Sequence, residues 1–458
     1  MKVKADAHSN SIARLLLSAL IAAVGLMACG GGGGSAGAGG QMPAPPPEGL
    51  VAVTVDVHPT MVMAPLDRAR MLAVPPGLKV RALARVPGAR FMRVLPTGDV
   101  LVSQPGSGRI VLVRPTGDAT STTSTFASGL RSPHDMVLVN LSGVWWLYVA
   151  ESHRVTRAVY NPGDTTIGTM QTVVDGLPDS STPELRGAYA HALKNIAVSA
   201  AGTLYVSIAS SCNACESDVN ATPVRGAVYR YDADGANGRL YARGIRNAEG
   251  LDFLPGTDQL WAVVNHRDQI AYPFDNDFDG DGASDLGRVM PAYVQTNPPE
   301  PFIRVRDGAN HGWPYCNPVA NGSMTDLELV ADHELNRDQS RLACSTVPRV
   351  EFGIAAHSAP LGLSFLQGTP LPAALSSGAA VALHGCWNCT APVGYKVVAV
   401  RFDGQGRPVG SEDLLTGFVG QTTASAWGRP VDVAAHPQRA SMLVSDDLGG
   451  VIYEVYAQ

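Results

Sequence analysis

One short strand-like pattern recurs six times in this chain, and it constrains the fold more than any other feature. Each copy is a run of apolar and small residues, most copies follow a turn containing Gly or Asp, and most precede a second β-rich run. The copies begin at Leu101, Leu147, Leu204, Leu260, Val381 and Leu443.

A spacing of roughly fifty residues, with several strands in each unit, is typical of a β-propeller. We therefore expect an all-β fold, namely a six-bladed β-propeller of four-stranded antiparallel blades. The one long interval, between the copies at Leu260 and Val381, would hold insertions between blades four and five. A β-sandwich is the alternative, but a sandwich would not show so regular a repeat.

The N-terminal segment has the composition of an export signal. Residues 1–28 begin with Lys2 and Lys4 and continue into a short apolar run, which is too short for a membrane span. The run ends at Ala28-Cys29, which looks like the lipobox of bacterial lipoproteins, where Cys29 would carry the lipid. An ordinary signal peptide with an incidental cysteine is the alternative.

Three segments are expected from this composition: a signal peptide (1–28), a Gly/Pro-rich tether (29–60) and the propeller domain (61–458). Gly30, rather than Asp, follows the cysteine. By resemblance to lipoprotein sorting, we expect a lipid anchor in the outer membrane of a bacterial cell envelope, with the domain facing the periplasm.

Charge and hydropathy exclude two classes of partner. The net charge is -6, and the lysines beyond the signal segment are Lys79, Lys194 and Lys396, so there is no basic stripe for nucleic acid. No second apolar run is long enough to span a bilayer. We therefore expect membrane contact through the lipid anchor alone.

The chain has seven cysteines. If Cys29 carries a lipid, six remain, and an exported protein usually pairs them as disulfides. Sequence order suggests the pairs Cys212–Cys215, Cys316–Cys344 and Cys386–Cys389, although fifteen connectivities are open for six cysteines. Zinc binding and redox chemistry are the alternatives for the two Cys-x-x-Cys pairs, but these pairs lie far apart. Neither pair is followed by His, so a covalent c-type haem is not expected.

An acidic loop resembles the first nine positions of an EF-hand calcium loop. It has carboxylates at alternate positions, a glycine for the sharp turn and a further aspartate, but Arg288 stands where the final glutamate would be. We expect a structural Ca²⁺ or a similar hard cation here, and an acidic solvated loop is the alternative. The expected ligands are Asp277, Asp279, Asp281 and Asp285.

Several short motifs occur in an order that resembles the glucose/sorbosone dehydrogenase family, propeller enzymes that carry pyrroloquinoline quinone (PQQ). Any one motif is weak, but the shared order extends from about Pro75 to the C-terminus. The motifs include Tyr189-Ala190-His191, Gly244-Ile245-Arg246-Asn247, Asn265-His266-Arg267-Asp268, Gly312-Trp313-Pro314, Gly394-Tyr395-Lys396 and Gly428-Arg429-Pro430.

The resemblance implies a role for each matching residue. His191, at the start of an expected strand, would be the general base that takes the proton of the substrate hydroxyl. The backbone carbonyls of His266 and Arg267 would hold a Ca²⁺ associated with PQQ. The side chains expected to hold PQQ are Lys194, Arg246, Asn247 and Arg429. Without the resemblance, a satisfied core histidine and a surface Arg–carboxylate pair would be the ordinary interpretations.

The implied activity is oxidation of an aldose or a sorbosone-like sugar aldehyde, with electrons passed to an external acceptor. Two departures from the family pattern occur. Lys194 replaces an arginine, and Cys389 replaces the arginine of Gly-Ser-Trp-Asn-Arg, which removes a positive charge near the expected cofactor. The alternatives are a cofactor-free propeller acting as a binding module, and a metal-dependent lactonase.

Overall fold

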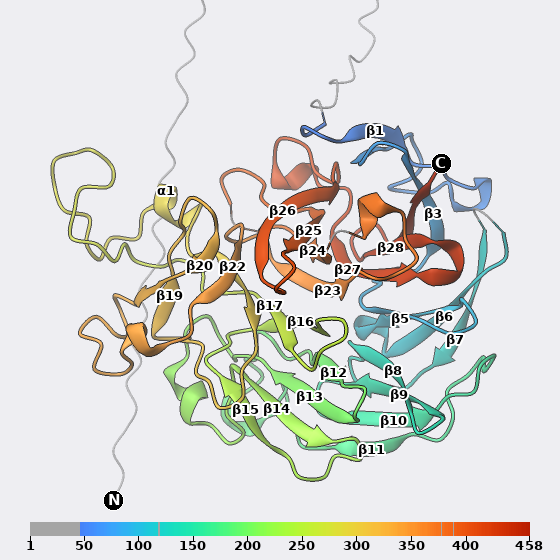
Figure 1. Ribbon diagram of the computed structural model, residues 1–458, viewed down its shortest axis with the longest axis horizontal. Helices are drawn as coiled ribbons and strands as arrows, with labels where there is room; N and C mark the ends of the chain where they lie inside the picture. The colour runs from blue at the N-terminus through green and yellow to red at the C-terminus, as the bar shows by residue number, and fades with distance from the viewer. Residues whose placement is uncertain (1–45, 118–119, 377, 388) are drawn as a thin grey trace, which may run out of the picture. The chain divides into compact units, whose positions relative to one another are not determined.

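The structure is a computed structural model that describes residues 46–117, 120–376, 378–387 and 389–458. It is a six-bladed β-propeller (Figure 1), which confirms the fold expected from the repeat. Cys29 and the signal segment lie outside the described residues. Within the described part of the chain, no helix is long and apolar enough to cross a membrane.

The first three blades follow one another along the chain, each with its strands in sequence order. Blade one consists of β4 (Met92–Val94), β5 (Val100–Gln104), β6 (Arg109–Pro115) and β7 (Ser121–Ala127). Blade two consists of β8 (Met136–Leu141), β9 (Val144–Ala150), β10 (Val155–Val159) and β11 (Gln171–Val174). Blade three consists of β12 (Ile196–Val198), β13 (Thr203–Ile208), β14 (Ala227–Asp232) and β15 (Arg239–Arg243).

The last three blades include the insertions and the ring closure. Blade four consists of β16 (Ala248–Phe253), β17 (Leu260–Val264), β18 (Glu300–Arg304) and β22 (Val350–Ile354), with β20 (Thr325–Leu327) at its edge. Blade five consists of β23 (Pro360–Phe365), β24 (Gly378–Leu383), β25 (Lys396–Phe402) and β26 (Pro408–Leu415). Blade six consists of β27 (Pro430–His436), β28 (Ser441–Asp446), β29 (Val451–Ala457) and β3 (Leu78–Arg85).

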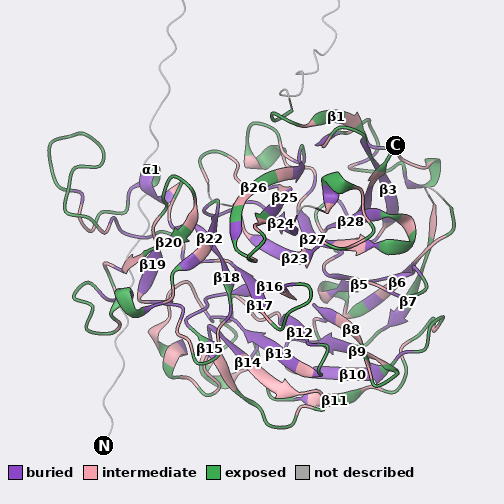
Figure 2. Ribbon diagram, viewed as in Figure 1, coloured by how far each residue is buried: buried purple, intermediate pink, exposed green. Residues whose placement is uncertain are grey.

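The recurring apolar pattern is the second strand of each blade, where both faces of the sheet are buried (Figure 2). In β13, Leu204 and Val206 pack against blade two, whereas Tyr205 packs against blade four. Because successive side chains of a strand point to opposite faces, a strand between two neighbouring sheets needs apolar residues at consecutive positions. The same alternation fills all six seams between blades with hydrophobic clusters.

Buried carboxylates also join neighbouring blades. Each accepts a backbone N–H from the inner strand of the next blade, and burial raises the pKa of Asp135 and Asp432 to about 7. The pairs are Asp432–Met92, Asp135–Ile196 and Asp252–Phe365, with N···O distances of 2.7, 2.9 and 3.0 Å.

The insertions lie within blade four, and not between blades four and five as expected. Residues 265–299 separate β17 from β18 and include α1 (Pro291–Val294). Residues 305–349 separate β18 from β22, and there β19 (Cys316–Pro318) pairs with β21 (Leu329–Ala331). The repeated strand at Leu260 is only the second of its blade, so the chain returns to the same sheet after each insertion.

The domain begins before residue 61. Strand β1 (Val51–Thr54) lies within the segment expected to be a tether, and it pairs with β2 (Met71–Val74). The 3₁₀ helices in the described part of the chain are short connections between strands.

The six cysteines of the domain pair as expected from their order. The disulfides are Cys212–Cys215, Cys316–Cys344 and Cys386–Cys389.

Disulfide removal should affect stability according to loop length. The Cys316–Cys344 bond spans 28 residues of sequence, whereas each other bond spans 3. The double substitution Cys316→Ala/Cys344→Ala should therefore lower the free energy of unfolding by about 3–4 kcal/mol, against about 2 kcal/mol for Cys386→Ala/Cys389→Ala. Denaturant unfolding of both variants measures this, and an equal or larger loss from the short loop would contradict it.

Candidate active site at the starts of the inner strands

Polar residues gather at one face of the propeller because of how each blade is threaded. In an antiparallel sheet, the start of the first strand and the end of the second lie at the same edge. The inner strands of the six blades contact one another in a ring, so this edge is shared by all blades. The polar residues shortly before the inner strands are Arg90, His134, His191, Arg246, His357 and Arg429.

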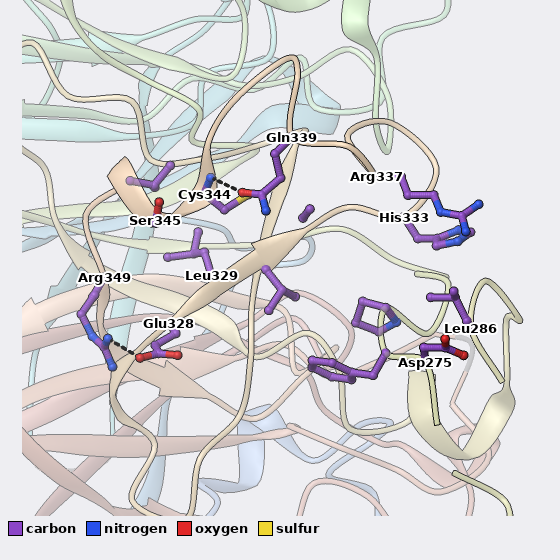
Figure 3. A pocket seen from close by; sticks show the side chains of 15 residues that line it. Asp275, Leu286, Glu328, Leu329, His333, Arg337, Gln339, Cys344, Ser345 and Arg349 are labelled. Carbon is purple, nitrogen blue, oxygen red and sulfur yellow. Dashed lines mark hydrogen bonds and ion pairs between the residues drawn. The ribbon is translucent and has the colours of Figure 1, made fainter. Parts of the chain in front are cut away.

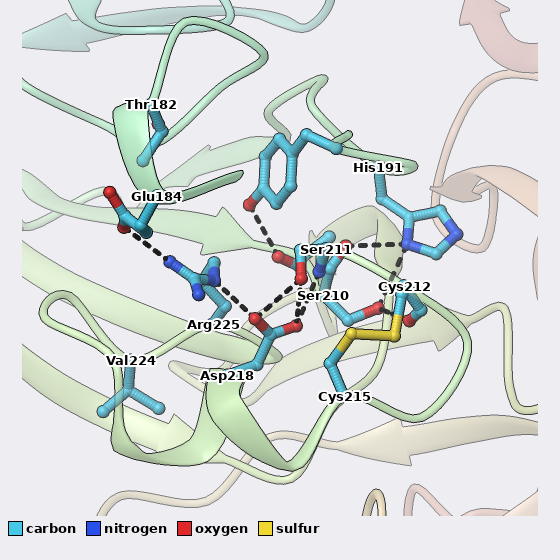
Figure 4. Close-up of polar contacts among 12 residues, drawn as sticks. Thr182, Glu184, His191, Ser210, Ser211, Cys212, Cys215, Asp218, Val224 and Arg225 are labelled. Carbon is cyan, nitrogen blue, oxygen red and sulfur yellow. Dashed lines mark hydrogen bonds and ion pairs between the residues drawn. A yellow bond between two sulfur atoms is a disulfide. The ribbon is translucent and has the colours of Figure 1, made fainter. Parts of the chain in front are cut away.

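His191 lies in a turn before β12, and not in a strand as expected. Its Nδ1 is 2.8 Å from the backbone oxygen of Ser210 and 3.0 Å from the Ser210 hydroxyl (Figure 4). A carbonyl oxygen can only accept, so Nδ1 must hold the ring proton. Nε2 is then an unprotonated base, and in Figure 4 it points away from the labelled polar residues.

The charge state of His191 suits a base. Burial, together with the nearby Arg246 guanidinium, lowers the pKa of His191 to about 4. The ring is therefore neutral at neutral pH, so its free nitrogen can accept a proton.

Arg246 and Asn247 lie in the loop between β15 and β16. Arg246 is buried, and it donates from Nε to the backbone oxygen of Asn213 (3.0 Å) and from Nη1 to that of Asn265 (3.1 Å). Its Nη2 is 3.6 Å from the Asp268 carboxylate. The Asn247 amide donates to Glu249 (3.1 Å). Arg246 is thus fixed by backbone oxygens, with one carboxylate at a longer distance.

His266 and Arg267 follow β17, at the same face. The Arg267 side chain pairs with Asp332 and Glu334 of the second insertion, and the His266 N–H donates to Glu300. Among the described residues, no hydrogen bond ends on the backbone oxygen of either His266 or Arg267. Both carbonyls expected to hold Ca²⁺ therefore have unused acceptor capacity.

A cavity of about 420 Å³ opens at this face between blades one, three, five and six. Arg429 lines it and donates to the backbone oxygens of His384 (2.9 Å) and Gly385 (2.6 Å). Burial lowers the pKa of Arg429, and the nearby Arg90 guanidinium acts in the same direction. Two guanidinium groups therefore face one cavity, which favours an anionic ligand.

Lys194 does not line this cavity, in contrast to the cofactor contact expected of it. Its ammonium donates to the backbone oxygens of Pro178 (2.8 Å) and Ala192 (2.5 Å) and is completely buried. Burial lowers the pKa of Lys194 to about 7. The neighbouring Leu193 lines the cavity instead.

Arg90 and Asp447 were missed by the sequence analysis. Arg90 pairs with Asp447 (3.0 Å), whose other oxygen is 2.9 Å from His384 Nε2. Burial alone would raise the pKa of Asp447, but the His384 hydrogen bond and the Arg90 charge lower it to about 2. Arg90 precedes the first strand of its blade, as Arg246 and Arg429 do, and this shared position was the available signal.

The acidic loop brings together three of its four expected ligands. Carboxylate oxygens of Asp277, Asp279 and Asp285 lie within 4.8 Å of one another. Asp281 is outside this group, and its carboxylate accepts the Ala283 N–H (2.8 Å). Arg288 forms ion pairs with Asp279 at 3.5 Å and with Asp281 at 3.7 Å, and it also pairs with Asp285.

A larger cavity of about 710 Å³ lies between the two insertions (Figure 3). His333 and Arg337 lie at one end, and the Glu328–Arg349 ion pair (2.7 Å) lies at the other. Its lining contains none of the expected catalytic or cofactor-binding residues, whereas Arg429 lines the smaller cavity. The other expected side chains at this face, namely His191, Arg246 and Asn247, line neither cavity. We therefore place the candidate active site at the smaller cavity.

The His357 ring lies between the site and the first insertion and contacts a hydrogen-bond acceptor with each of its two nitrogens. Its Nδ1 is 2.9 Å from the Asp268 carboxylate, and its Nε2 is 2.6 Å from the Val294 carbonyl. Both nitrogens face acceptors, so the imidazolium form fits best. Burial would lower the pKa of His357, but the hydrogen bond to Asp268 and the charges of Glu300 and Asp268 raise it.

This pair should make stability depend on pH. The raised pKa means that folded His357 binds its proton more tightly than unfolded His357, so its contribution is complete below the unfolded pKa and is lost as pH rises through the folded pKa. His357→Gln should therefore lower the free energy of unfolding by about 1.5–3 kcal/mol at pH 6 and by less at pH 9. Denaturant unfolding tests this with His58→Gln as the control, and a loss independent of pH would contradict it.

Comparisons with known proteins agree with this architecture. The holo form of the pyranose dehydrogenase PQQ domain from Coprinopsis cinerea is similar with a TM-score of 0.67 and 18% identity, covering 84% of this chain and 97% of that chain. The calcium structure of a carbohydrate-active enzyme of family AA12 from Trichoderma reesei has a TM-score of 0.67 and 19% identity, covering 84% and 96%. The apo form of the soluble aldose sugar dehydrogenase from Escherichia coli has a TM-score of 0.55 and 15% identity, covering 83% and 100%.

A curated relative from Borreliella burgdorferi, named only "Uncharacterized protein", is 28% identical over 219 residues, or 47% of this chain and 48% of the relative. The match thus spans about half the length of that relative. The resemblance to PQQ-dependent dehydrogenase propellers is confirmed by the shared fold and by a family model described as TrAA12-like, which matches residues 72–458. The chain belongs to the TrAA12-like family.

Proposed function

We propose that this protein is a PQQ-dependent oxidoreductase that oxidises an aldose or a sorbosone-like sugar aldehyde. One observation carries the proposal: His191 presents an unprotonated Nε2 at the face where Arg246, Arg429 and Arg90 gather. A neutral base and cationic side chains at one face suit the removal of a hydroxyl proton next to an anionic cofactor. The PQQ domain and sugar dehydrogenase among the similar structures support the same chemistry.

The residues at this face fit PQQ, which has three carboxylates and quinone oxygens. Arg246 and Arg429 would hold carboxylates through their guanidinium groups. Arg90 would add a further hydrogen-bond donor, since its charge is paired with Asp447 but its buried Nε has no partner in the described structure. The free carbonyl oxygens of His266 and Arg267 would hold the accompanying Ca²⁺, a cation that prefers oxygen ligands.

The residues of the chain would act as follows. Bound PQQ supplies the acceptor for the hydride equivalent of the substrate. His191 Nε2 takes the hydroxyl proton, while the Nδ1–H bond to Ser210 keeps the ring oriented. Burial and Arg246 disfavour the protonated ring, so His191 releases that proton readily. A separate partner then removes the electrons.

A second function deserves a test because of one substitution. Cys389 stands where the resembling family has an arginine, and it is bonded to Cys386. This change favours a cofactor-free propeller that binds a ligand without oxidising it. Uptake of PQQ by the natural chain separates the two functions.

The proposed location is the bacterial outer membrane, with Cys29 as the lipid anchor and the propeller in the periplasm. The N-terminal sequence supports this placement, which suits a protein whose domain contains three disulfides.

Sugar-dependent dye reduction tests the function. His191→Ala should lower kcat by roughly 10²–10⁴-fold and leave PQQ affinity nearly unchanged, because the base contributes to proton transfer and not to cofactor binding. Arg246→Ala should weaken PQQ binding first, since it removes charge-assisted hydrogen bonds. His436→Gln, a buried histidine outside the site, is the matched control.

Two results would reject the enzyme proposal. One is full activity in His191→Ala. The other is a natural chain that takes up no PQQ at micromolar concentration while Cys386→Ser/Cys389→Arg does, in which case the binding function would be favoured.

A further inference from the structure

A buried polar chain connects His191 to an acidic residue that none of the proposed roles uses. Asp218 lies in the short 3₁₀ helix η4 (Glu216–Asn220), directly after the Cys212–Cys215 disulfide. Its side chain is completely buried, and so is that of its partner Arg225, which donates to it at 2.5 Å. Figure 4 shows both residues beneath the loop that contacts His191.

The chain begins at the residues that orient His191. The Ser210 carbonyl accepts from His191 Nδ1 (2.8 Å), and the adjacent Ser211 carbonyl accepts the Ala190 N–H (2.9 Å). The turn that contains His191 has no strand or helix of its own to hold it. Ser210 and Ser211 therefore set both the backbone and the ring of the base.

Asp218 in turn holds Ser211. Its carboxylate accepts the Ser211 N–H (2.6 Å) and the Ser211 hydroxyl (2.8 and 3.0 Å). Charge-assisted hydrogen bonds of this kind are stronger and more directional than neutral ones. The buried carboxylate thus fixes the segment on the Ser211 side, while the Ser210 N–H donates to the Arg246 carbonyl (2.7 Å).

Arg225 closes the network on the other side. Besides Asp218, it pairs with Glu184 at 3.3 Å. Glu184 lies in η3 (Pro183–Leu185), in the middle of the connection between β11 and β12 that also contains His191. The middle of that connection, at Glu184, and its later part, at Ala190, are therefore linked through the ion pair between Asp218 and Arg225.

We propose that Asp218 is a positioning residue for His191, acting through Ser211 and Ser210 to keep the Nδ1–H bond that leaves Nε2 free as the base. The proposal rests on the proposed function for its catalytic consequence. A buried ion pair is weak evidence for stability by itself, because desolvation offsets much of the attraction. Placing a catalytic ring is a role that this geometry supports directly.

The test follows the His191 ring by ¹⁵N NMR, alongside kinetics and PQQ titration, in Asp218→Asn. His191→Gln identifies the signal. The wild type should show the Nδ1–H tautomer, and Asp218→Asn should show a mixture of tautomers. Its kcat should fall roughly tenfold or more, because misplacement of a catalytic group by a fraction of an ångström is costly. KM and PQQ affinity should change by less than about twofold.

Two further variants keep the test decisive. Ser211→Ala removes only the hydroxyl bonds to Asp218, so it should shift the tautomers in the same direction. It provides the test if Asp218→Asn does not fold. Asp99→Asn is the matched control, since it also breaks a buried carboxylate–arginine pair, with Arg114 at 2.8 Å, but at the opposite edge of its blade. Arg246 and Asp268, the charges that act on His191 directly, remain in every variant.

The outcomes separate this proposal from the proposed function. A wild-type tautomer and wild-type kcat in folded Asp218→Asn or Ser211→Ala, with only a lower Tm, would overturn the positioning role. A tautomer shift in Asp218→Asn together with full activity in His191→Ala would support the positioning of the ring and reject His191 as the base.

Discussion

The structure depends on packing each blade on both of its faces. Strands such as β13 bury residues toward two neighbours at once, so no blade is stable without the blades beside it. The ring must therefore close, and it does so when β3, from the start of the domain, pairs with β29 at the end. Closure places both ends of the folded chain in one blade and makes the six seams a single continuous core. The aspartates Asp135, Asp252 and Asp432 add directional bonds across three of these seams.

The same architecture explains why polar groups can gather in the middle of an apolar ring. Inner strands all begin at one face, so a residue placed before each strand reaches the mouth of the central channel. Hydrogen bonds to backbone oxygens offset the desolvation of Arg246 and His191. Arg246 donates to the carbonyls of Asn213 and Asn265, and His191 donates to that of Ser210. Blade four departs most from the common pattern. Its insertions contact residues of the candidate site, since Asp332 pairs with Arg267 and the Val294 carbonyl contacts His357. The most irregular part of the fold therefore lies next to the candidate active site.

Much of the fold could be predicted because the propeller repeats a local pattern. Each repeated apolar strand in the sequence is the second strand of a blade, and consecutive apolar positions record its two-sided burial. The sequence analysis placed the insertions between two blades because strand pairing across them is non-local. No pattern between Val264 and Glu300 indicates that the chain returns to the same sheet. Lys194 was assigned to the cofactor because its actual partners are backbone carbonyls, which no side chain in the sequence identifies. Arg90 and Asp447 come from opposite ends of the chain, so their pairing appears only in the folded ring.

The proposed function depends on PQQ binding beside Arg429, with His191 as the base at the same face. A crystal structure of the protein grown with PQQ and Ca²⁺ tests it most directly. The account predicts PQQ in contact with Arg246 and Arg429, a cation on the carbonyls of His266 and Arg267, and His191 Nε2 facing the substrate side of the quinone. A structure in which saturating PQQ leaves this face empty, or binds elsewhere on the propeller, would contradict it.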